Sequence, residues 1–248
     1  RPGANSEFHL VDERLVGAKP QNLSFADAAA LPLTAITAWE LLFDRLQLDL
    51  ASPQFQQKVL LVSGAAGGVG SVLLQLARQK TDAFIIGTAS RPESQAWVQQ
   101  MGAHAVINHQ LPLAEELARL GIKQVSHVVS LVDTAAYYDE FIAALAPQGK
   151  LALIDDPQTA LDIRPLKLKS LSLHWELMFT RSLFQTPDQI AQHQLLNAVS
   201  KMVEDGTLQS TTGQYLGQIT AANLRIAHEL LETGKVVGKL VLSGFPKL

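Results

Sequence analysis

The sequence predicts an α/β protein built around a doubly wound parallel sheet, and two observations support this. A short apolar strand, a glycine-rich turn and an amphipathic helix follow one another between Lys58 and Lys80. Further apolar, strand-like runs recur after this unit, with helical segments between them. Such alternation is typical of βαβ units, which place parallel strands side by side and helices on both faces of the sheet.

The segment before the glycine turn predicts one strand and two helices. Glu7–Val11 is strand-like, although no partner strand precedes it in the sequence. Ser24 offers a helix cap with an acid three residues further on, and Pro32 interrupts the apolar run that follows. A second helix is expected from about Leu33 to Leu46. Because the chain starts at Arg1 without a methionine, we expect a preceding part of the protein to be missing from it.

The glycine-rich turn is the most specific signal in the chain. Lys58–Val62 is a short apolar run, as expected of a strand that is buried on both faces. The turn Ser63–Gly70 follows, and apolar residues then recur at helical spacing from Val69 to Ala77. Free N–H groups and the positive dipole end of a helix attract an anion, and glycines let a diphosphate approach the main chain. The residues expected at the diphosphate of a dinucleotide are Gly67, Gly68, Val69 and Gly70.

A purely structural role is the alternative for this turn. Leu73 stands where the usual dinucleotide fingerprint has a third glycine, so the glycines could serve only to pack the helix closely on the strand. A triphosphate loop of the Walker type is excluded, because no Gly-Lys-Ser/Thr sequence follows the turn.

The end of the next strand indicates which dinucleotide is bound. After Ala83–Thr88, Ser90 falls where NAD-binding domains carry an acid that accepts the adenosine ribose hydroxyls. Arg91 can pair bidentately with a 2′-phosphate and Ser90 can donate a hydrogen bond to it, so we expect NADPH rather than NADH. The alternative is that Arg91 is a solvated residue ahead of the helix that Pro92 begins.

The remaining strands follow the same pattern, with helices between them. They are expected at Ala105–Asn108, Val125–Val132, Leu151–Asp155 and Leu171–Trp175.

Composition bounds the function classes. The chain has 248 residues, of which 47% are hydrophobic and 17% charged, so it is long enough for a well-buried core. Its net charge of −3 and scattered cations argue against nucleic acid as a partner. Its apolar runs fall short of the ~20 residues that span a bilayer, and no membrane partner is expected. Zero cysteines exclude disulfides and thiolate metal sites within the chain and are compatible with a cytoplasmic protein.

Five motifs follow one another along the chain: Ala30–Trp39, the Gly64–Gly70 turn, Gly102-Ala103, Pro147–Lys150 and Gly234–Leu242. In this order they resemble the medium-chain dehydrogenase/reductase superfamily, over nearly the whole chain. Within it, the chain is similar to the quinone oxidoreductase-like branch and to proteins named zinc-binding alcohol dehydrogenase family, with Trp175–Arg181 as a more local likeness.

The resemblance implies a bilobed enzyme in which a GroES-like catalytic domain packs against a Rossmann domain. Residues 1–31 would be the C-terminal part of the GroES-like domain, most of which the chain would lack. Residues 32–206 would form the Rossmann NADP-binding domain, and residues 207–248 would return to the catalytic domain. The resemblance also implies a homodimer formed through Rossmann edge strands, with Leu171–Trp175 as the candidate interface strand.

Zinc catalysis is not expected from this chain. In zinc alcohol dehydrogenases a cysteine ligand precedes the Rossmann domain, whereas the corresponding stretch here reads Ala-Leu-Pro-Leu-Thr. The seven histidines are dispersed, and His174 has only Glu176 close to it in sequence. We therefore expect no metal site in this chain, with zinc ligands in a missing N-terminal part as the alternative.

The reaction that the resemblance implies is zinc-independent hydride transfer from NADPH to a quinone, an enone or another activated carbonyl compound. No catalytic residue is identified, because the candidates would lie upstream of this chain, and the fragment alone is expected to be inactive. Thr34 and Thr37 are candidates for cofactor contact from the helix that precedes the turn. Asp133 and Asp155 follow strands at the carboxyl edge of the sheet and could border the nicotinamide, although helix capping would explain both equally well.

Two rivals remain beside this hypothesis. A short-chain dehydrogenase needs a Tyr-x-x-x-Lys pair, but Phe141, Ile142 and Ile219 stand four residues after the three tyrosines. The second rival is a non-catalytic NADPH-binding sensor or structural protein, and the sequence does not separate it from an enzyme.

Overall fold

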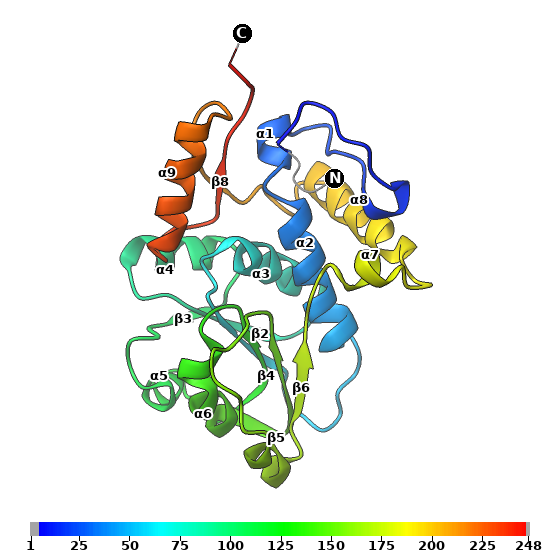
Figure 1. Cartoon of the computed structure of the whole chain (residues 1–248). Coiled ribbons are helices and arrows are strands. Elements are labelled where there is room, and N and C mark those ends of the chain that lie inside the picture. The colour runs from blue at the N-terminus through cyan, green and yellow to red at the C-terminus, as the bar shows by residue number, and fades with distance from the viewer. Residues whose placement is uncertain (1–4, 247–248) are drawn as a thin grey trace. The chain divides into compact units, whose positions relative to one another are not determined.

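The computed structural model describes residues 5–246 and confirms the doubly wound parallel sheet (Figure 1). Six parallel strands lie in the order β3-β2-β1-β4-β5-β6. The order reverses between β1 and β4, and the carboxyl edge beside such a reversal is where open sheets of this kind bind ligands. The strands are β1 (Val59–Ser63), β2 (Phe84–Thr88), β3 (Ala105–Ile107), β4 (Val125–Ser130), β5 (Leu145–Leu153) and β6 (Ser172–Trp175).

The helices alternate with these strands, as the sequence predicts. Helices in and before the sheet region are α1 (Phe25–Ala28), α2 (Pro32–Trp39), the π-helix η2 (Glu40–Arg45), α3 (Gly68–Lys80), α4 (Pro92–Gln100), α5 (Leu113–Arg119) and α6 (Thr134–Ala144). After the sheet come α7 (Thr180–Phe184), α8 (Ile190–Glu204) and α9 (Ala221–Glu232), with the short 3-10 turns η1 (Glu13–Leu15) and η3 (Arg164–Lys169) elsewhere in the chain.

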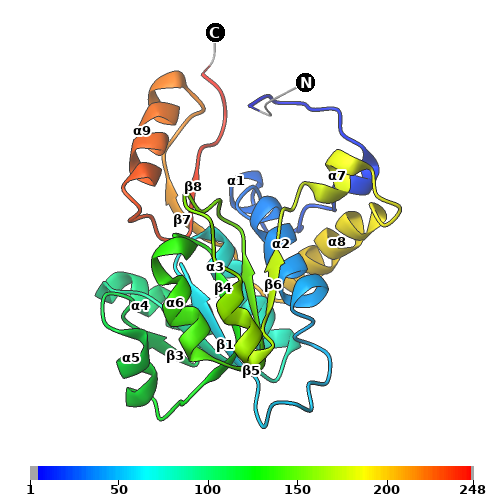
Figure 2. The same cartoon turned by 60° about the horizontal axis from the view of Figure 1, so that its bottom comes forward.

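The chain forms two compact units. One unit is Thr37–Leu177 and contains the whole six-stranded sheet. The other unit combines the chain up to Ile36 with the chain from Met178 onward, and it holds the parallel pair β7 (Thr212–Tyr215) and β8 (Lys239–Val241). Helix α9 lies beside β8 in both views of the molecule (Figure 1, Figure 2). The domain boundaries predicted from the sequence, after Leu31 and Gly206, stay a prediction.

Strands β1 and β4 are buried along their whole length. Burial on both faces explains the apolar run Val59–Val62 of β1, whereas β4 also buries the polar residues Ser126, His127 and Ser130. On one face of the sheet, side chains such as Leu61 and Val128 form a hydrophobic core with α5 and α6, and Phe141 of α6 is 1% exposed there. On the other face Gly87 of β2 leaves room for Val98 of α4. Hence both faces are covered, as a parallel sheet requires.

The N-terminal predictions are confirmed in part. The Ser24 hydroxyl accepts the Asp27 N–H at 3.0 Å and caps α1 as expected. The predicted second helix begins at Pro32 and widens to π-helical pairing near its end, where the Leu46 N–H donates to Leu41 O. The strand predicted at Glu7–Val11 is wrong, because this segment has no regular structure: no described strand pairs with it, and extended backbone needs such a partner to become a strand.

The end of the helical segment is anchored by buried charges. The Arg45 guanidinium bonds to the carboxylate of Glu176 at 2.7 Å and lies 3.6 Å from that of Glu40, and both carboxylates are almost fully buried. Lys150 Nζ donates to Leu46 O just beyond the helix. Phe25–Arg45 is long and apolar enough to cross a membrane by length and composition alone, but buried helices of soluble proteins pass the same test. Paired charges against the sheet agree with packing inside the protein.

A fully buried histidine lies in β4 on the face of the sheet opposite α5 and α6. Ser126 Oγ donates to Val59 O and accepts the Val59 N–H, so the 2.7 Å contact between Ser126 Oγ and His127 Nδ1 assigns the imidazole proton to Nδ1. The His127 Nε2 atom has no hydrogen-bond partner among residues 5–246. Burial, followed by the nearby Lys150 and Lys58 cations, lowers the pKa of His127 to about 3.

We expect this histidine to make the protein acid-sensitive. Between the unfolded-state pKa of ~6.5 and the folded-state pKa of about 3, only the unfolded chain binds the proton. The free energy of unfolding therefore decreases as the pH is lowered through this range. The loss attributable to His127 is about 2 kcal/mol between pH 7 and pH 5. Urea unfolding at both pH values measures it. His127→Asn keeps a donor toward Ser126 without titrating, and an equally steep pH dependence in that variant would contradict the assignment.

Candidate functional site

The glycine turn joins β1 to α3 at the carboxyl edge of the sheet, beside the point where the strand order reverses. Gly64 has a φ of +72°, a conformation that side chains other than glycine rarely adopt. A Cβ at Gly70 would lie 2.4 Å from Ala65 O, so no larger residue fits there without moving the backbone. These two glycines therefore shape the turn, whereas a Cβ at Gly67 would be 3.4 Å from its nearest atom, Gly64 O.

The first turn of α3 presents free donors, as the sequence analysis expects. The N–H groups of Gly68, Val69 and Gly70 donate to no residue within the described part of the chain. Gly67 caps the helix, and its carbonyl oxygen accepts both the Ser71 N–H at 2.9 Å and the Ser71 hydroxyl at 2.7 Å. Three unpaired N–H groups at the positive end of a helix form a site for an anion.

A neighbouring helix holds this turn. The indole N–H of Trp97 in α4 donates to Ser71 Oγ at 2.8 Å, and Ser71 is fully buried. One helical turn further on, Gln75 Nε2 lies 3.4 Å from Met101 Sδ. These paired contacts form a seam between α3 and α4.

The other predicted phosphate ligands lie at the start of α4. Ser90 is half-buried after β2, and Arg91 occupies the position that caps α4. The Arg91 N–H is hydrogen-bonded to Ser94 Oγ, which in turn donates to Arg91 O at 2.9 Å. Thus the backbone of Arg91 is fixed by its own helix at the end of a strand that neighbours β1. No acidic residue stands between Asp82 and Glu93.

The two predicted aspartates differ in their surroundings. Asp155 Oδ2 accepts the Thr134 N–H at 2.8 Å, and Oδ1 bonds to the Thr134 hydroxyl, so this carboxylate caps α6 from beyond β5. Asp133 directly precedes α6 with a φ of +47°, and its side chain is exposed. Of the two, Asp133 keeps the more accessible carboxylate at this edge.

The two predicted threonines are both buried. The Thr34 hydroxyl donates to Leu31 O at 3.0 Å and to Ala30 O at 3.2 Å within its own helical segment. Thr37 is 5% exposed. Contact of either threonine with a cofactor stays a prediction.

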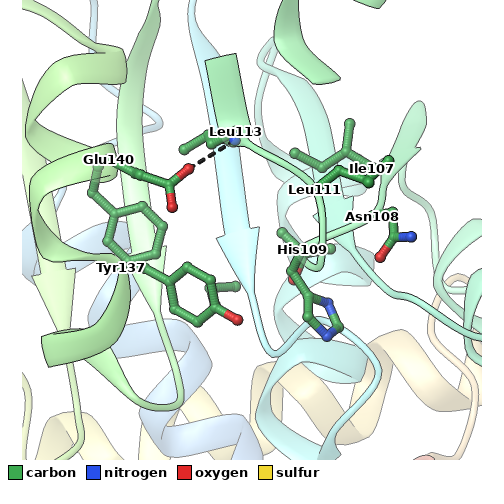
Figure 3. A pocket seen from close by; sticks show the side chains of 10 residues that line it. Ile107, Asn108, His109, Leu111, Leu113, Tyr137 and Glu140 are labelled. Carbon is green, nitrogen blue, oxygen red and sulfur yellow. Dashed lines mark hydrogen bonds between the residues drawn. The ribbon is translucent and has the colours of Figure 1, made fainter. Parts of the chain in front are cut away.

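A small cavity of about 20 Å³ lies at the same edge of the sheet (Figure 3). Tyr137 and Glu140 of α6 border one side, and the chain after β3, including His109, borders the other (Figure 3). Glu140 accepts the Leu113 N–H at 2.7 Å and thereby caps α5. His109 Nδ1 is buried without a partner in the described residues, and burial lowers the pKa of this imidazole. The remaining lining residues are Ser63, Thr88, Ile107, Asn108, Leu111 and Phe141.

The described residues do not fit a zinc centre. No three His, Asp or Glu side chains gather into a possible metal site in the part of the chain that the structure describes, and the sequence has no cysteine. His174 and Glu176, which the sequence analysis names as close in sequence but not as a metal site, lie on and just after β6, where Glu176 is bonded to Arg45. The nearest hydrogen-bond partner of the His174 ring is Ser172, at 3.3 Å.

Sequence reasoning missed Ser71, Trp97 and the cavity residues His109 and Tyr137. Ser71 stands one helical turn after Gly67, which could have indicated its bond to that carbonyl. The contact of Trp97 depends on how α4 packs on α3, and no local sequence signal encodes it. The sequence analysis considers the histidines only as possible metal ligands, and nothing in the sequence around His109 indicates a cavity.

Comparisons with known proteins agree with this geometry. The family model described as zinc-binding dehydrogenase matches residues 101–242. A zinc-type alcohol dehydrogenase-like protein of Staphylococcus aureus (strain MSSA476) is 37% identical over 243 residues, which cover 98% of this chain and 72% of the relative. The chloroplastic NADPH-dependent alkenal/one oxidoreductase of Arabidopsis thaliana is 34% identical over 116 residues, covering 46% of this chain and 28% of the relative.

A solved structure matches the whole fold. It comes from Rhizobium etli CFN 42 and carries a provisional name, zinc-dependent alcohol dehydrogenase. It is 52% identical with a TM-score of 0.95, and the match covers 100% of this chain and 72% of that one.

We expect Gly70→Ala to destabilise the protein by about 1–3 kcal/mol, the usual cost of forcing extra atoms into a filled site. Its new Cβ would collide with the Ala65 carbonyl. Gly67→Ala is the matched control, because its Cβ meets only an ordinary contact and the fold should lose less than about 1 kcal/mol. Chemical unfolding compares the two. Equal losses would show that Gly70 has no special structural role.

Proposed function

Since the chain belongs to the zinc-binding dehydrogenase family of the medium-chain dehydrogenase/reductase superfamily, we propose that it is part of a cytoplasmic oxidoreductase that uses NADPH. The acceptor in this proposal is a quinone, an enone or another activated carbonyl compound, reduced without zinc. The observation that carries the proposal is the pairing of three free N–H groups at the start of α3 with an arginine, and no acid, at the start of α4.

In this proposal the protein binds the cofactor mainly through its backbone. The Gly68, Val69 and Gly70 N–H groups donate to the diphosphate, and the absent side chain of Gly67 lets it approach. Arg91 and Ser90 hold the 2′-phosphate, where an acid in their place would repel it. These contacts fix the position of the whole molecule along the edge of the sheet.

Bound NADPH would supply a hydride to an electrophilic carbon of the acceptor. The exposed Asp133 carboxylate lies at the carboxyl end of β4, where its contribution would be to orient the nicotinamide half of the cofactor. In this proposal Asp155 has an indirect role. It caps α6 and so fixes the left-handed backbone of Asp133, which directly precedes that helix. Catalytic groups are assigned to none of the described residues.

The names of relatives support different parts of this proposal. The Arabidopsis relative is named for NADPH and for alkenal/one acceptors, which agrees with an enone as substrate. The Staphylococcus relative is named as zinc-type, but the described residues of this chain do not form a zinc site. A zinc-dependent alcohol dehydrogenase with ligands outside this chain, or a non-catalytic NADPH-binding sensor, are the alternative functions.

A titration of the chain with NADPH and NADH tests the cofactor. We expect tighter binding of NADPH, and we expect Arg91→Ala to weaken NADPH roughly ten- to hundredfold through the loss of a charge-assisted contact of about 1.5–3 kcal/mol. Binding of NADH should hardly change in this variant. Arg164→Ala is the control, because Arg164 is exposed and paired with Asp162 after β5. Calorimetry gives all the dissociation constants.

Each other outcome has a distinct meaning. Equal affinity for both nucleotides, unchanged in Arg91→Ala, would remove the NADPH assignment but keep a dinucleotide site. Binding of neither nucleotide would overturn the proposed site. NADPH binding without oxidation by any quinone or enone would favour the sensor.

We also propose that the chain forms a homodimer through β6. This strand ends one side of the sheet, and no described strand lies on its outer edge. Trp175 in β6 and Leu168 just before it expose 51% and 91% of their surface. An unpaired apolar edge of this kind is a liability unless another chain covers it. Two copies of β6 paired across a twofold axis would remove both edges.

Leu173→Pro tests this interface. The Glu176 N–H donates to Leu153 O of the neighbouring strand β5. Successive N–H groups along a strand point to opposite edges, so the Leu173 N–H, three residues earlier, points to the outer edge of β6. A proline at this position removes that donor. We expect the substituted protein to sediment as a monomer. Leu173→Val loses similar packing but keeps the N–H, and it should remain a dimer. A monomeric unsubstituted protein, or a dimeric proline variant, would contradict the proposal.

A further inference from the structure

The donors of the phosphate-binding turn are held by a short chain of hydrogen bonds that starts in another helix. Trp97 Nε1 donates to Ser71 Oγ at 2.8 Å, and Ser71 Oγ donates to Gly67 O at 2.7 Å. We call these two bonds the Trp97–Ser71–Gly67 link. Ser71 is fully buried and Trp97 half-buried, so water competes little for the serine hydroxyl.

The geometry of a peptide bond gives this link a consequence for the ligand site. In a trans peptide the C=O of one residue and the N–H of the next point in opposite directions. The Ser71 N–H and hydroxyl both hold Gly67 O inside the first turn of α3. The Gly68 N–H, which shares that peptide plane, must then point away from the helix, toward the place expected for the diphosphate.

The Ser71 hydroxyl depends on Trp97 for its direction. A serine hydroxyl can rotate, and its single proton can be given to only one acceptor at a time. The indole N–H is a donor only, so it occupies a lone pair of Ser71 Oγ and leaves the hydroxyl proton directed at Gly67 O. Without the indole, the hydroxyl is free to rotate, and the Gly67–Gly68 peptide loses one of its two restraints.

We propose that Trp97 is a positioning residue for the diphosphate turn: acting through Ser71, it orients the Gly67–Gly68 peptide and aims its N–H at the bound diphosphate. The inference rests on the proposed dinucleotide function and deepens it. It also joins the two phosphate sites, because the helix that carries Trp97 begins at Arg91, the proposed 2′-phosphate ligand. Trp97 itself touches no ligand in this role.

Two probes separate positioning from a general structural effect. ADP-ribose carries the diphosphate without a 2′-phosphate, and adenosine 2′-monophosphate carries the 2′-phosphate without a diphosphate. Trp97→Phe keeps an aromatic ring but removes the donor. We expect it to weaken ADP-ribose and NADPH about three- to tenfold, the range for loss of one neutral hydrogen bond, and to leave adenosine 2′-monophosphate unchanged. NMR titration measures each dissociation constant.

Variants at the other end of the link and along the seam complete the test. Ser71→Ala should weaken ADP-ribose at least as much as Trp97→Phe, and the double variant should lose no more than Ser71→Ala alone, because both act through one hydroxyl. Met101→Leu is the matched control: it changes the same α3–α4 seam one turn away, keeps the apolar volume, and should bind every probe normally.

The outcomes distinguish the inference from the function it rests on. Unchanged ADP-ribose affinity in Trp97→Phe overturns the inference, as does equal weakening of both probes, which would show general loosening of α4. Additive losses in the double variant would also overturn it, since the two residues would then act independently. If the unsubstituted chain binds NADPH but not through its diphosphate, only the inference fails. If it binds neither NADPH nor ADP-ribose, the proposed function fails with it.

Discussion

The contact between Gly70 and the Ala65 carbonyl is the constraint on which the candidate site depends. A Cβ at Gly70 would come within 2.4 Å of that oxygen, so glycine alone lets α3 begin so close to the end of β1. This tight start places the free N–H groups of the helix at the carboxyl edge of the central strand. A looser connection would carry them away from the point where the strand order reverses, which is where a ligand can reach several strands at once.

Much of this arrangement could be predicted from the sequence, because a strand that is buried on both faces tends to be a continuous run of apolar residues. β1 is apolar from Val59 to Val62 for that reason. The failures have equally physical causes. The strand predicted from Leu151 begins at Leu145 instead. Leu145 already pairs with Val125 of β4, and the register shifts before the next pair, His127 with Lys150. Glu7–Val11 has the composition of a strand but no described neighbour, and composition alone cannot supply the missing hydrogen bonds.

For the candidate site, the sequence predicted Asp133 and Asp155 together but could not distinguish their surroundings. Asp133 and Asp155 look alike in the chain, since each follows an apolar strand. Only the structure shows that Asp155 is engaged by the N–H and hydroxyl of Thr134, while Asp133 stays exposed with a left-handed backbone. Similarly, Ser71 and Trp97 are 26 positions apart, and their hydrogen bond exists because α3 and α4 pack side by side. Contacts that depend on packing between helices leave no local pattern to read.

This division suggests how affinity and selectivity can vary separately in such a site. In the proposed site the diphosphate donors are backbone N–H groups, which side-chain substitutions other than proline leave in place. Their strength as donors therefore depends on how firmly the surrounding side chains orient them. Trp97 and Ser71 provide that orientation from within the fold. In the proposed site, selectivity between nucleotides instead depends on the side chain of Arg91, which lies outside the turn. Because Arg91 begins the same helix that carries Trp97, a shift of α4 would alter both properties, whereas a substitution at Arg91 would alter one.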